Sequence, residues 1–414
     1  VNFKGNSIRL YFDEFVDLQD VSRNLLFTPL FENVPVIEAK LRTLTLRIRD
    51  TLEPNTTYTF NFGNAIKDIN EGNVLRNFTY TFSTGPSLDS LTLSGKVLLA
   101  ESGKIDTTLI VVLHRNLADS AVRKERPRYV TRLNGSGGFT FRNLPAGTFA
   151  IYAMSDLGGT RRYQTETQLF AFTDAPIVIS DTTRDITLYA SREQAAPVTA
   201  AITPSRTNAA DRRLRFTTNV ANNQQSLLDS LKITFEQPLR SFDAARVTLF
   251  TDSVFNQITA FTTQLDSAKK SMTLLTAWKP QTLYNLVLDK EFAEDTLGRK
   301  LLKSDTLFFT TRKLADYGAL NIRIHNVDTA LNPVLQFVQN DAVVFSAPLI
   351  GGRYTQNLFL PGEYDLRILY DANRNGRWDP GRFFGVRRNP ERVQPITRKI
   401  SVKAASDNDF DIQL

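Results

Sequence analysis

The chain is 414 residues long and carries 50 lysine and arginine residues against 43 aspartate and glutamate residues. The absence of cysteine excludes disulfide bonds and cysteine-ligated zinc, and two histidines leave little material for a histidine-based metal or acid–base centre. The length allows roughly two to four domains, and abundant phenylalanine and tyrosine favour strands, so we expect an all-β protein of tandem β-sandwich modules. No apolar run reaches the roughly 18 residues of a membrane-spanning helix, and no secretory signal opens the chain.

The first 86 residues contain three stretches with the pattern of short strands. They are Ser7–Val16 (S-I-R-L-Y-F-D-E-F-V), Leu52–Phe62 (L-E-P-N-T-T-Y-T-F-N-F) and Phe78–Thr84 (F-T-Y-T-F-S-T). A loop around Asp68 and Gly72 lies between the second and the third. Short strands separated by proline, asparagine and glycine turns predict a β-sandwich.

The same order returns in the second half of the chain. The corresponding stretches are Leu231–Leu239 (L-K-I-T-F-E-Q-P-L), Trp278–Leu288 (W-K-P-Q-T-L-Y-N-L-V-L) and Thr306–Thr311 (T-L-F-F-T-T). A proline precedes a tyrosine by four residues in both copies, at Tyr58 and at Tyr284. This pair resembles the bacterial Ig-like family that is common in surface-layer proteins and surface lipoproteins, over roughly Val1–Pro86 and Ala200–Arg312.

The second copy has room for a leading strand at Arg213–Asn219, whereas eleven residues precede Phe12 in the first copy. We therefore expect the first strand of the first module to lie upstream of Val1. Any signal peptide or lipid-bearing cysteine would lie there too.

A second kind of repeat alternates with the first. Leu91–Leu99 opens its first copy, which continues to G-F-T-F-R-N-L-P-A-G-T-F-A-I-Y-A-M-S-D at Gly138–Asp156. Its partner is N-L-F-L-P-G-E-Y-D-L-R-I-L-Y-D at Asn357–Asp371. A short strand, a Leu-Pro turn with glycine, an aromatic residue and an apolar strand that ends in aspartate resemble small transthyretin-like (carboxypeptidase regulatory-like) sandwich domains.

Four modules in A-B-A′-B′ order are therefore predicted. The first Ig-like module takes residues 1–87, the first transthyretin-like module 88–192, the second Ig-like module 193–314, and the second transthyretin-like module 315–414.

A calcium-type loop follows the strand that ends at Tyr370. Oxygen donors recur there at every second position, at Asp371, Asn373 and Asn375, with Gly376 at position 6 for the sharp bend and Asp379 at position 9. The predicted metal site comprises Asp371, Asn373, Asn375, Arg377 and Asp379.

The loop departs from an EF-hand because position 12 is Arg382 and the flanks are not helices. Asp379 or Glu391 could complete the calcium shell, and the alternative is a solvated turn of asparagine, aspartate and glycine. With two charged ligands in the loop, we expect calcium affinity near the weak end, on the order of 10⁻⁴ to 10⁻³ M. In the first copy, Asp156 is followed by L-G-G-T-R-R-Y-Q, which lacks the donors, so Asp156 is expected only to cap its turn.

Arginine is frequent around and after this loop, at Arg374, Arg377, Arg382, Arg387, Arg388, Arg392 and Arg398. These arginines predict either a surface for an anionic glycan, lipid headgroup or acidic partner, or an ordinary solvated face. No recognised motif accompanies the charge, so we do not expect nucleic-acid binding.

Trp378 is expected to pack as a lid over the strand, with an exposed sugar platform as the alternative.

The whole chain resembles a family of surface lipoproteins from Bacteroidota-type bacteria. The residues that carry this resemblance are the loop D-x-N-x-N-G-x-W-D-x-G at Asp371–Gly381 and the following Pro390-Glu391. It implies a non-enzymatic protein that is lipid-anchored at the outer membrane, on its periplasmic or cell-surface face. It also implies a structural or accessory subunit that docks onto an outer-membrane protein or lipoprotein complex, such as assembly or export machinery. The alternative is a calcium-dependent glycan-binding or adhesive protein.

Overall fold

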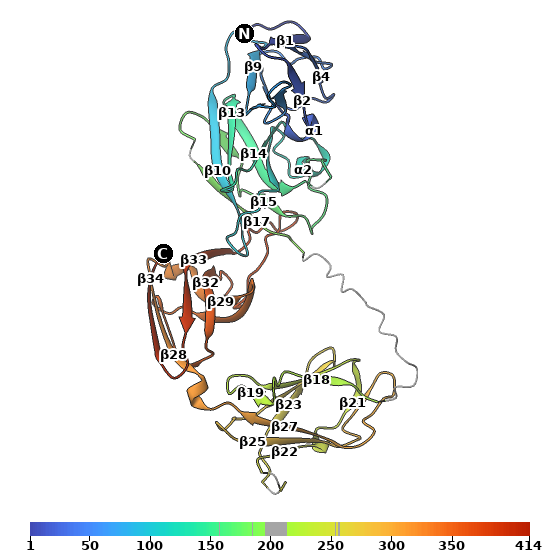
Figure 1. Ribbon diagram of the computed structural model, residues 1–414, viewed down its shortest axis with the longest axis vertical. Helices are drawn as coiled ribbons and strands as arrows, with labels where there is room; N and C mark the ends of the chain where they lie inside the picture. Colours follow the sequence, from blue (N-terminus) through green and yellow to red (C-terminus); the bar gives the residue numbers. More distant parts are fainter. Residues whose placement is uncertain (157, 184, 195–212, 253, 256) are drawn as a thin grey trace. The chain divides into compact units, whose positions relative to one another are not determined.

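The computed structural model describes residues 1–156, 158–183, 185–194, 213–252, 254–255 and 257–414 (Figure 1). Strands dominate this part of the chain, and its helices are short. The helical segments are α1 (Val21–Asn24), α2 (Ala121–Lys124), η1 (Ala244–Arg246), η2 (Leu314–Asp316) and η3 (Thr329–Leu331). None of the helices in the described ranges has the length and apolar character needed to cross a membrane.

Nine strands form the first module. They are β1 (Ser7–Tyr11), β2 (Val16–Leu18), β3 (Leu26–Thr28), β4 (Val36–Lys40), β5 (Thr43–Arg47), β6 (Thr57–Asn61), β7 (Ile66–Asp68), β8 (Val74–Leu75) and β9 (Thr79–Ser83). Three sheets result, with orders β1-β5-β4, β3-β6-β9 and β2-β7-β8. Inward-facing residues such as Leu44, Leu46 and Phe60 have no exposed surface and form the core between them.

The second module contains eight strands among its described residues. They are β10 (Leu91–Leu99), β11 (Leu109–His114), β12 (Tyr129–Arg132), β13 (Gly138–Leu144), β14 (Gly147–Ser155), β15 (Phe170–Phe172), β16 (Ile177–Ile179) and β17 (Ile186–Ala190). One sheet has the order β13-β10-β17 and the other β12-β11-β14-β15, with β16 beside β14. Residues including Val111, Leu113 and Phe149 fill the core between them.

The third module contains ten strands among its described residues. They are β18 (Phe216–Thr218), β19 (Gln224–Gln225), β20 (Leu231–Phe235), β21 (Leu239–Phe242), β22 (Val247–Phe250), β23 (Thr262–Leu265), β24 (Ser271–Leu275), β25 (Leu283–Leu288), β26 (Ala293–Asp295) and β27 (Asp305–Thr311). Their sheets have orders β18-β20-β24-β23, β19-β27-β25-β22 and β21-β26. The leading strand predicted at Arg213–Asn219 is β18, which pairs with β20.

Seven strands form the fourth module. They are β28 (Gly318–His325), β29 (Pro333–Gln339), β30 (Ala342–Pro348), β31 (Arg353–Phe359), β32 (Gly362–Tyr370), β33 (Arg392–Val402) and β34 (Asp407–Gln413). Their sheets have orders β31-β28-β34 and β30-β29-β32-β33. Each sheet in the described ranges takes its strands from one module, which confirms the predicted all-β class of tandem sandwiches.

The chain divides into two compact units. One comprises Val1–Val198, Ala330–Gln336 and Arg367–Pro395, and the other Thr199–Thr329, Phe337–Leu366 and Ile396–Leu414. The loop after β32 therefore belongs with the first two modules. The predicted module boundaries remain predictions, and residues 195–212, directly after the second module, lie outside the described residues.

The first predicted repeat has a physical basis in a buried tyrosine. The Tyr58 ring stacks on Phe82 with centroids 5.4 Å apart, and the Tyr284 ring stacks on Phe309 at 5.8 Å. In both modules the tyrosine hydroxyl accepts the backbone N–H of the residue five positions earlier, at 2.9 and 3.1 Å. The shared proline-to-tyrosine spacing therefore marks a hairpin that is anchored in the same way twice.

The second repeat is confirmed by strand pairing. β10 lies antiparallel to β13 and parallel to β17, and β28 lies antiparallel to β31 and parallel to β34. The glycines that open β14 and β32, Gly147 and Gly362, have φ angles of 156° and 154°, a conformation that favours glycine. The second and fourth modules therefore share one topology.

Gly95 lies where β10 is closest to its neighbours, and we expect Gly95→Ala to destabilise the second module. An added Cβ would lie 2.1 Å from the Ile186 carbonyl oxygen and 2.7 Å from the Phe139 ring. Overpacking of this kind typically costs about 1–3 kcal/mol. Hydrogen exchange should accelerate in peptides covering β10, β13 and β17. Gly135→Ala is the control, because its Cβ would have no neighbour within 4 Å; equal exchange in both variants would contradict the prediction.

Candidate functional site

Asp371 anchors the loop that follows β32. Its side chain is 2% exposed. Its Oδ2 accepts the Gly376 N–H at 2.7 Å, and its Oδ1 accepts the Asn375 N–H at 3.2 Å. The tight bend at Gly376, where φ is 72°, thus closes on the carboxylate.

Asp379 collects the two asparagine side chains of the loop. Its Oδ2 accepts the Asn373 Nδ2–H at 2.6 Å and the Asn375 Nδ2–H at 2.7 Å. Arg377 enters the network through its backbone, whose N–H donates to Asn375 Oδ1 at 2.7 Å. The loop therefore joins all five residues predicted from the sequence in one hydrogen-bond network.

Glu391 braces the ends of this loop. Its Oε1 accepts the Ala372 N–H at 2.8 Å, its Oε2 accepts the Asp379 N–H at 3.0 Å, and its own N–H donates to the Asp379 carbonyl at 3.0 Å. Burial, and to a lesser degree the carboxylates of Asp371 and Asp379, raise the pKa of Glu391. Glu391 therefore holds the two ends of the loop together by hydrogen bonds to the loop backbone.

The donor chemistry of the loop fits calcium in part. Carboxylate, amide and carbonyl oxygens are the ligands that calcium prefers, and the loop contains all three. However, in the described part of the chain, no three His, Asp or Glu side chains lie close enough together to hold a metal. A cation would depend on amide oxygens, but Asn373 Oδ1 and Asn375 Oδ1 accept the backbone N–H groups of Asn375 and Arg377, and Asp379 Oδ2 accepts both amide side-chain N–H groups. An ion would have to compete with these bonds. That competition is expected to weaken binding.

Trp378 packs over the end of the strand. It is partly buried against Val334, Leu369 and Val393, and its Nε1–H donates to the Glu391 carbonyl at 2.8 Å. This is the arrangement expected of a lid. An exposed sugar platform would need an accessible ring face that is free of such packing.

Residues 380–389, which directly follow the loop, form what we call the latch, because they pack onto the second module. Phe383 is 2% exposed, and its ring centroid lies 5.0 Å from that of Phe172, 5.3 Å from Phe170 and 5.4 Å from Tyr152. Phe384 stacks on Tyr163 at 5.9 Å. The latch therefore fills an aromatic surface on the outer face of the sheet that contains β14 and β15.

Polar contacts surround this aromatic core. The Gly381 N–H donates to Ser191 Oγ at 3.2 Å, and the Phe383 N–H donates to Glu193 Oε1 at 3.1 Å. Arg387 forms an ion pair with Asp119. Its guanidinium carbon also lies 4.5 Å from the Phe383 ring centroid. The latch is thus held by apolar, backbone and ionic contacts together.

These contacts change the interpretation of the arginines. Arg387 pairs with Asp119, Arg392 lies over the Tyr189 ring at 5.6 Å, and Arg374 Nε donates to Asn332 Oδ1 at 3.0 Å. In the other unit, Arg398 Nη1 donates to the Asp411 carbonyl at 3.0 Å. Internal partners therefore engage these four residues, and a surface for an external anion remains a prediction.

Asp156, the counterpart of Asp371, caps a turn as predicted. Its Oδ1 accepts the Arg161 N–H at 2.8 Å, and its carbonyl accepts the Gly159 N–H at 3.3 Å. The shared aspartate thus ends the strand in both modules, while the additional oxygen donors belong to the fourth module.

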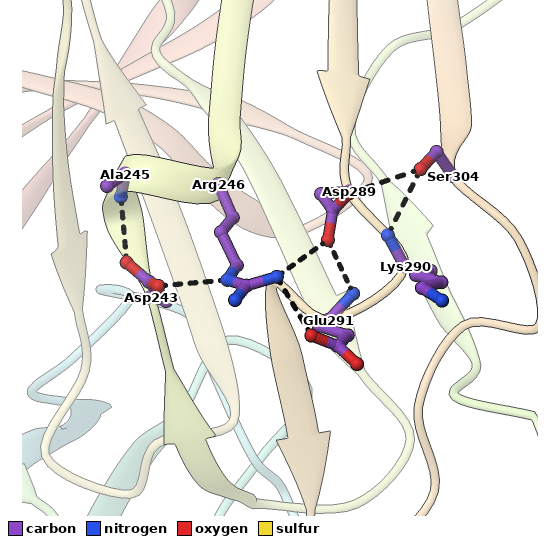
Figure 2. Close-up of polar contacts among 7 residues, drawn as sticks. All are labelled: Asp243, Ala245, Arg246, Asp289, Lys290, Glu291 and Ser304. Atoms are coloured by element: carbon purple, nitrogen blue, oxygen red, sulfur yellow. Dashed lines mark hydrogen bonds and ion pairs between the residues drawn. The ribbon is translucent and has the colours of Figure 1, made fainter.

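A separate acidic cluster in the third module surrounds Arg246 (Figure 2). The guanidinium donates to Asp243 at 3.1 Å, to Asp289 at 3.1 Å and to Glu291 at 3.0 Å. The Glu291 N–H bond to Asp289, together with Arg246, lowers the pKa of Asp289. Because the three carboxylates share one guanidinium, we assign the cluster a structural role in joining the turns at η1 and after β25.

The packing of the latch on the second module was not predicted from the sequence, although β14 contains a signal for it. Six consecutive residues of this strand, from Phe149 to Met154, are buried. Such a continuous apolar run is typical of a strand covered on both faces. It indicates that something covers the outer face but does not identify the segment.

Comparisons with known proteins address the first module most directly. Residues 1–84 match the family model described as a bacterial Ig-like domain, which confirms the expected family for that module. The match covers about a fifth of the chain. A search of the curated proteins found no match.

Solved structures of multi-domain proteins align with the chain at low similarity. They include the TIE protein of Bacillus anthracis, with 11% identity, coverage of 97% of this chain and 67% of the other, and a TM-score of 0.19. BcpA, the major pilin subunit of Bacillus cereus, has 8% identity, coverage of 78% and 98%, and a TM-score of 0.18. The T6 backbone pilin of Streptococcus pyogenes has 8% identity, coverage of 79% and 98%, and a TM-score of 0.16. At these TM-scores, the alignments carry no argument about function.

Proposed function

We propose that the protein is a non-enzymatic structural or accessory subunit at the bacterial cell surface. In this proposal, it is lipid-anchored to the outer membrane and docks onto an outer-membrane protein complex, such as assembly or export machinery. The Ig-like first module and the tandem sandwiches support a structural role.

The observation that carries the proposal is the latch. A long loop that buries Phe383 between Tyr152, Phe170 and Phe172 keeps a segment distant in sequence in one position on the second module. A subunit that presents surfaces to a large partner benefits from such preorganisation, because less conformational freedom is lost on binding.

A pull-down from detergent-solubilised native membranes tests this function. The chain should retrieve a membrane protein or lipoprotein in stoichiometric amount, and the protein expressed from its native gene should incorporate radiolabelled fatty acid in the cell. Recovery of the bait alone, from membranes that contain it, would argue against docking. Absence of fatty-acid labelling would contradict the proposed lipid anchor but would not bear on the proposed docking.

We also propose that the loop at Asp371–Asp379 binds calcium weakly. The carboxylate and amide side chains gathered around Asp379 support this proposal, and the competition of an ion with their internal hydrogen bonds supports low affinity.

Calcium-dependent glycan binding is the second candidate function. Trp378 and the neighbouring arginines motivate it, and the packing of Trp378 against Val334, Leu369 and Val393 weakens it. A glycan array probed with and without calcium tests this candidate, and absence of binding in both conditions would reject it.

A further inference from the structure

The edge of one sheet in the second module is covered by the first module. The Leu30 N–H donates to the Arg128 carbonyl at 3.0 Å, directly before β12. Leu26 and Leu30 pack against the apolar cluster that contains Val130, which is 3% exposed. The segment that begins at β3 thus covers the edge strand β12, whose backbone groups would otherwise invite pairing.

The corresponding edge of the fourth module is exposed among the described residues. β30 occupies the same position beside β29 that β12 occupies beside β11. Its residues Val343, Val344 and Phe345 are 39%, 49% and 41% exposed. Three consecutive apolar residues exposed on an edge strand are the kind of surface that soluble proteins usually protect.

The third module carries the counterpart of the covering segment. β22 pairs with β25 as β3 pairs with β6, so the chain after β22 corresponds to the chain after β3. There Val254, Phe255 and Ile258 are 67%, 40% and 70% exposed. We call these three described residues the apolar tip.

One contact between the third and fourth modules does not involve the tip or the β30 edge. The Tyr317 hydroxyl accepts the Leu227 N–H at 2.7 Å and bonds to Ser226 Oγ at 3.2 Å. The named residues of both apolar surfaces are exposed in this structure.

We propose that these surfaces join two copies of this chain, with the apolar tip of one copy covering β30 of the next. The partner is a second copy because the chain carries both halves of the interface and already joins the equivalent pair once, between its first and second modules. A contact between two different surfaces is heterologous, so it propagates into linear head-to-tail assemblies unless a rotation closes it. The proposal is independent of docking onto an outer-membrane complex.

Sedimentation of the purified chain tests the proposal without any other protein. The weight-average mass should rise above the 46.7 kDa monomer as concentration increases. Val344→Lys and Phe255→Asp should each abolish this rise, since each removes one half of the interface. Val178→Lys on β16, where Val178 is 65% exposed, is the matched control and should associate like the wild type.

A mixture of the two interface variants gives the sharpest outcome. The Val344→Lys chain keeps an intact tip and the Phe255→Asp chain keeps an intact edge, so together they should form dimers that grow no further. A wild-type chain that stays monomeric at all concentrations would overturn the proposal, as would variants that associate like the wild type. Because the assay contains one protein, its result is separate from that of the membrane pull-down.

Discussion

Replacing Phe383 with alanine is expected to raise the rate of tryptic cleavage at Arg382 and Arg388 by about two to three and a half powers of ten. Phe383 is buried among three aromatic rings of the second module, and truncation of a buried phenylalanine typically costs about 3–5 kcal/mol. Every 1.4 kcal/mol is about tenfold in an equilibrium constant. When opening is fast relative to cleavage, proteolysis follows the population of the open form.

Val386→Ala is the matched control for this change. Val386 lies three residues further along the latch but is 83% exposed, so its truncation removes little buried surface. We expect cleavage close to the wild-type rate. A Phe383→Ala chain that is cleaved no faster than the Val386→Ala chain would show that the aromatic contacts do not hold the latch.

Calcium at 10 mM is expected to stabilise the fourth-module loop by about 1.4–2.7 kcal/mol. This range follows from an affinity of about 10⁻⁴ to 10⁻³ M and from the stabilisation that a ligand gives when it binds only the folded state. Terbium luminescence sensitised by Trp378, with calcium as competitor, measures the affinity directly. Magnesium should compete less well, because it demands a smaller and more regular octahedral site.

Asp379→Asn should abolish the calcium response with little change in the shape of the loop. The substitution keeps a carbonyl oxygen for Asn373 and Asn375 but removes a charge that the ion needs. Asp156→Asn in the second module is the matched control, because its turn lacks the additional donors. A calcium response that survives Asp379→Asn, or that is absent from the wild type, would leave the loop as a hydrogen-bonded turn.

The loop and the latch are adjacent, so calcium should also slow latch cleavage. Asp379 ends the loop and Pro380 begins the latch. Glu391, which lies just after the other end of the latch, bonds to the Asp379 backbone. An ion that orders Asp379 therefore restrains both ends of the latch. Tryptic cleavage with and without calcium in the Asp379→Asn chain separates this effect from any action of calcium on the protease.

The modular plan could be derived from the sequence because its signals are local. Hairpins and strand ends are indicated by three local features. These are the alternation of apolar residues, the proline four residues before Tyr58 and Tyr284, and the glycine that opens the strand before Asp156 and Asp371. These features depend on backbone geometry and on contacts within one module. The convergence of Asp371, Asn373, Asn375 and Asp379 was predictable for the same reason, since all four lie within nine residues.

Contacts between modules were decided only by the tertiary structure. Nothing in the sequence near Phe383 identifies Tyr152 as its neighbour, because the two are separated by more than an entire module and meet only after both have folded. The arginines illustrate the same limit. Arg387 lies in an arginine-rich stretch that suggests a basic surface, but in the structure it is paired with Asp119. Local periodicity determines which face of a strand is apolar, whereas the segment that covers that face depends on shape and charge matched across long separations in the chain.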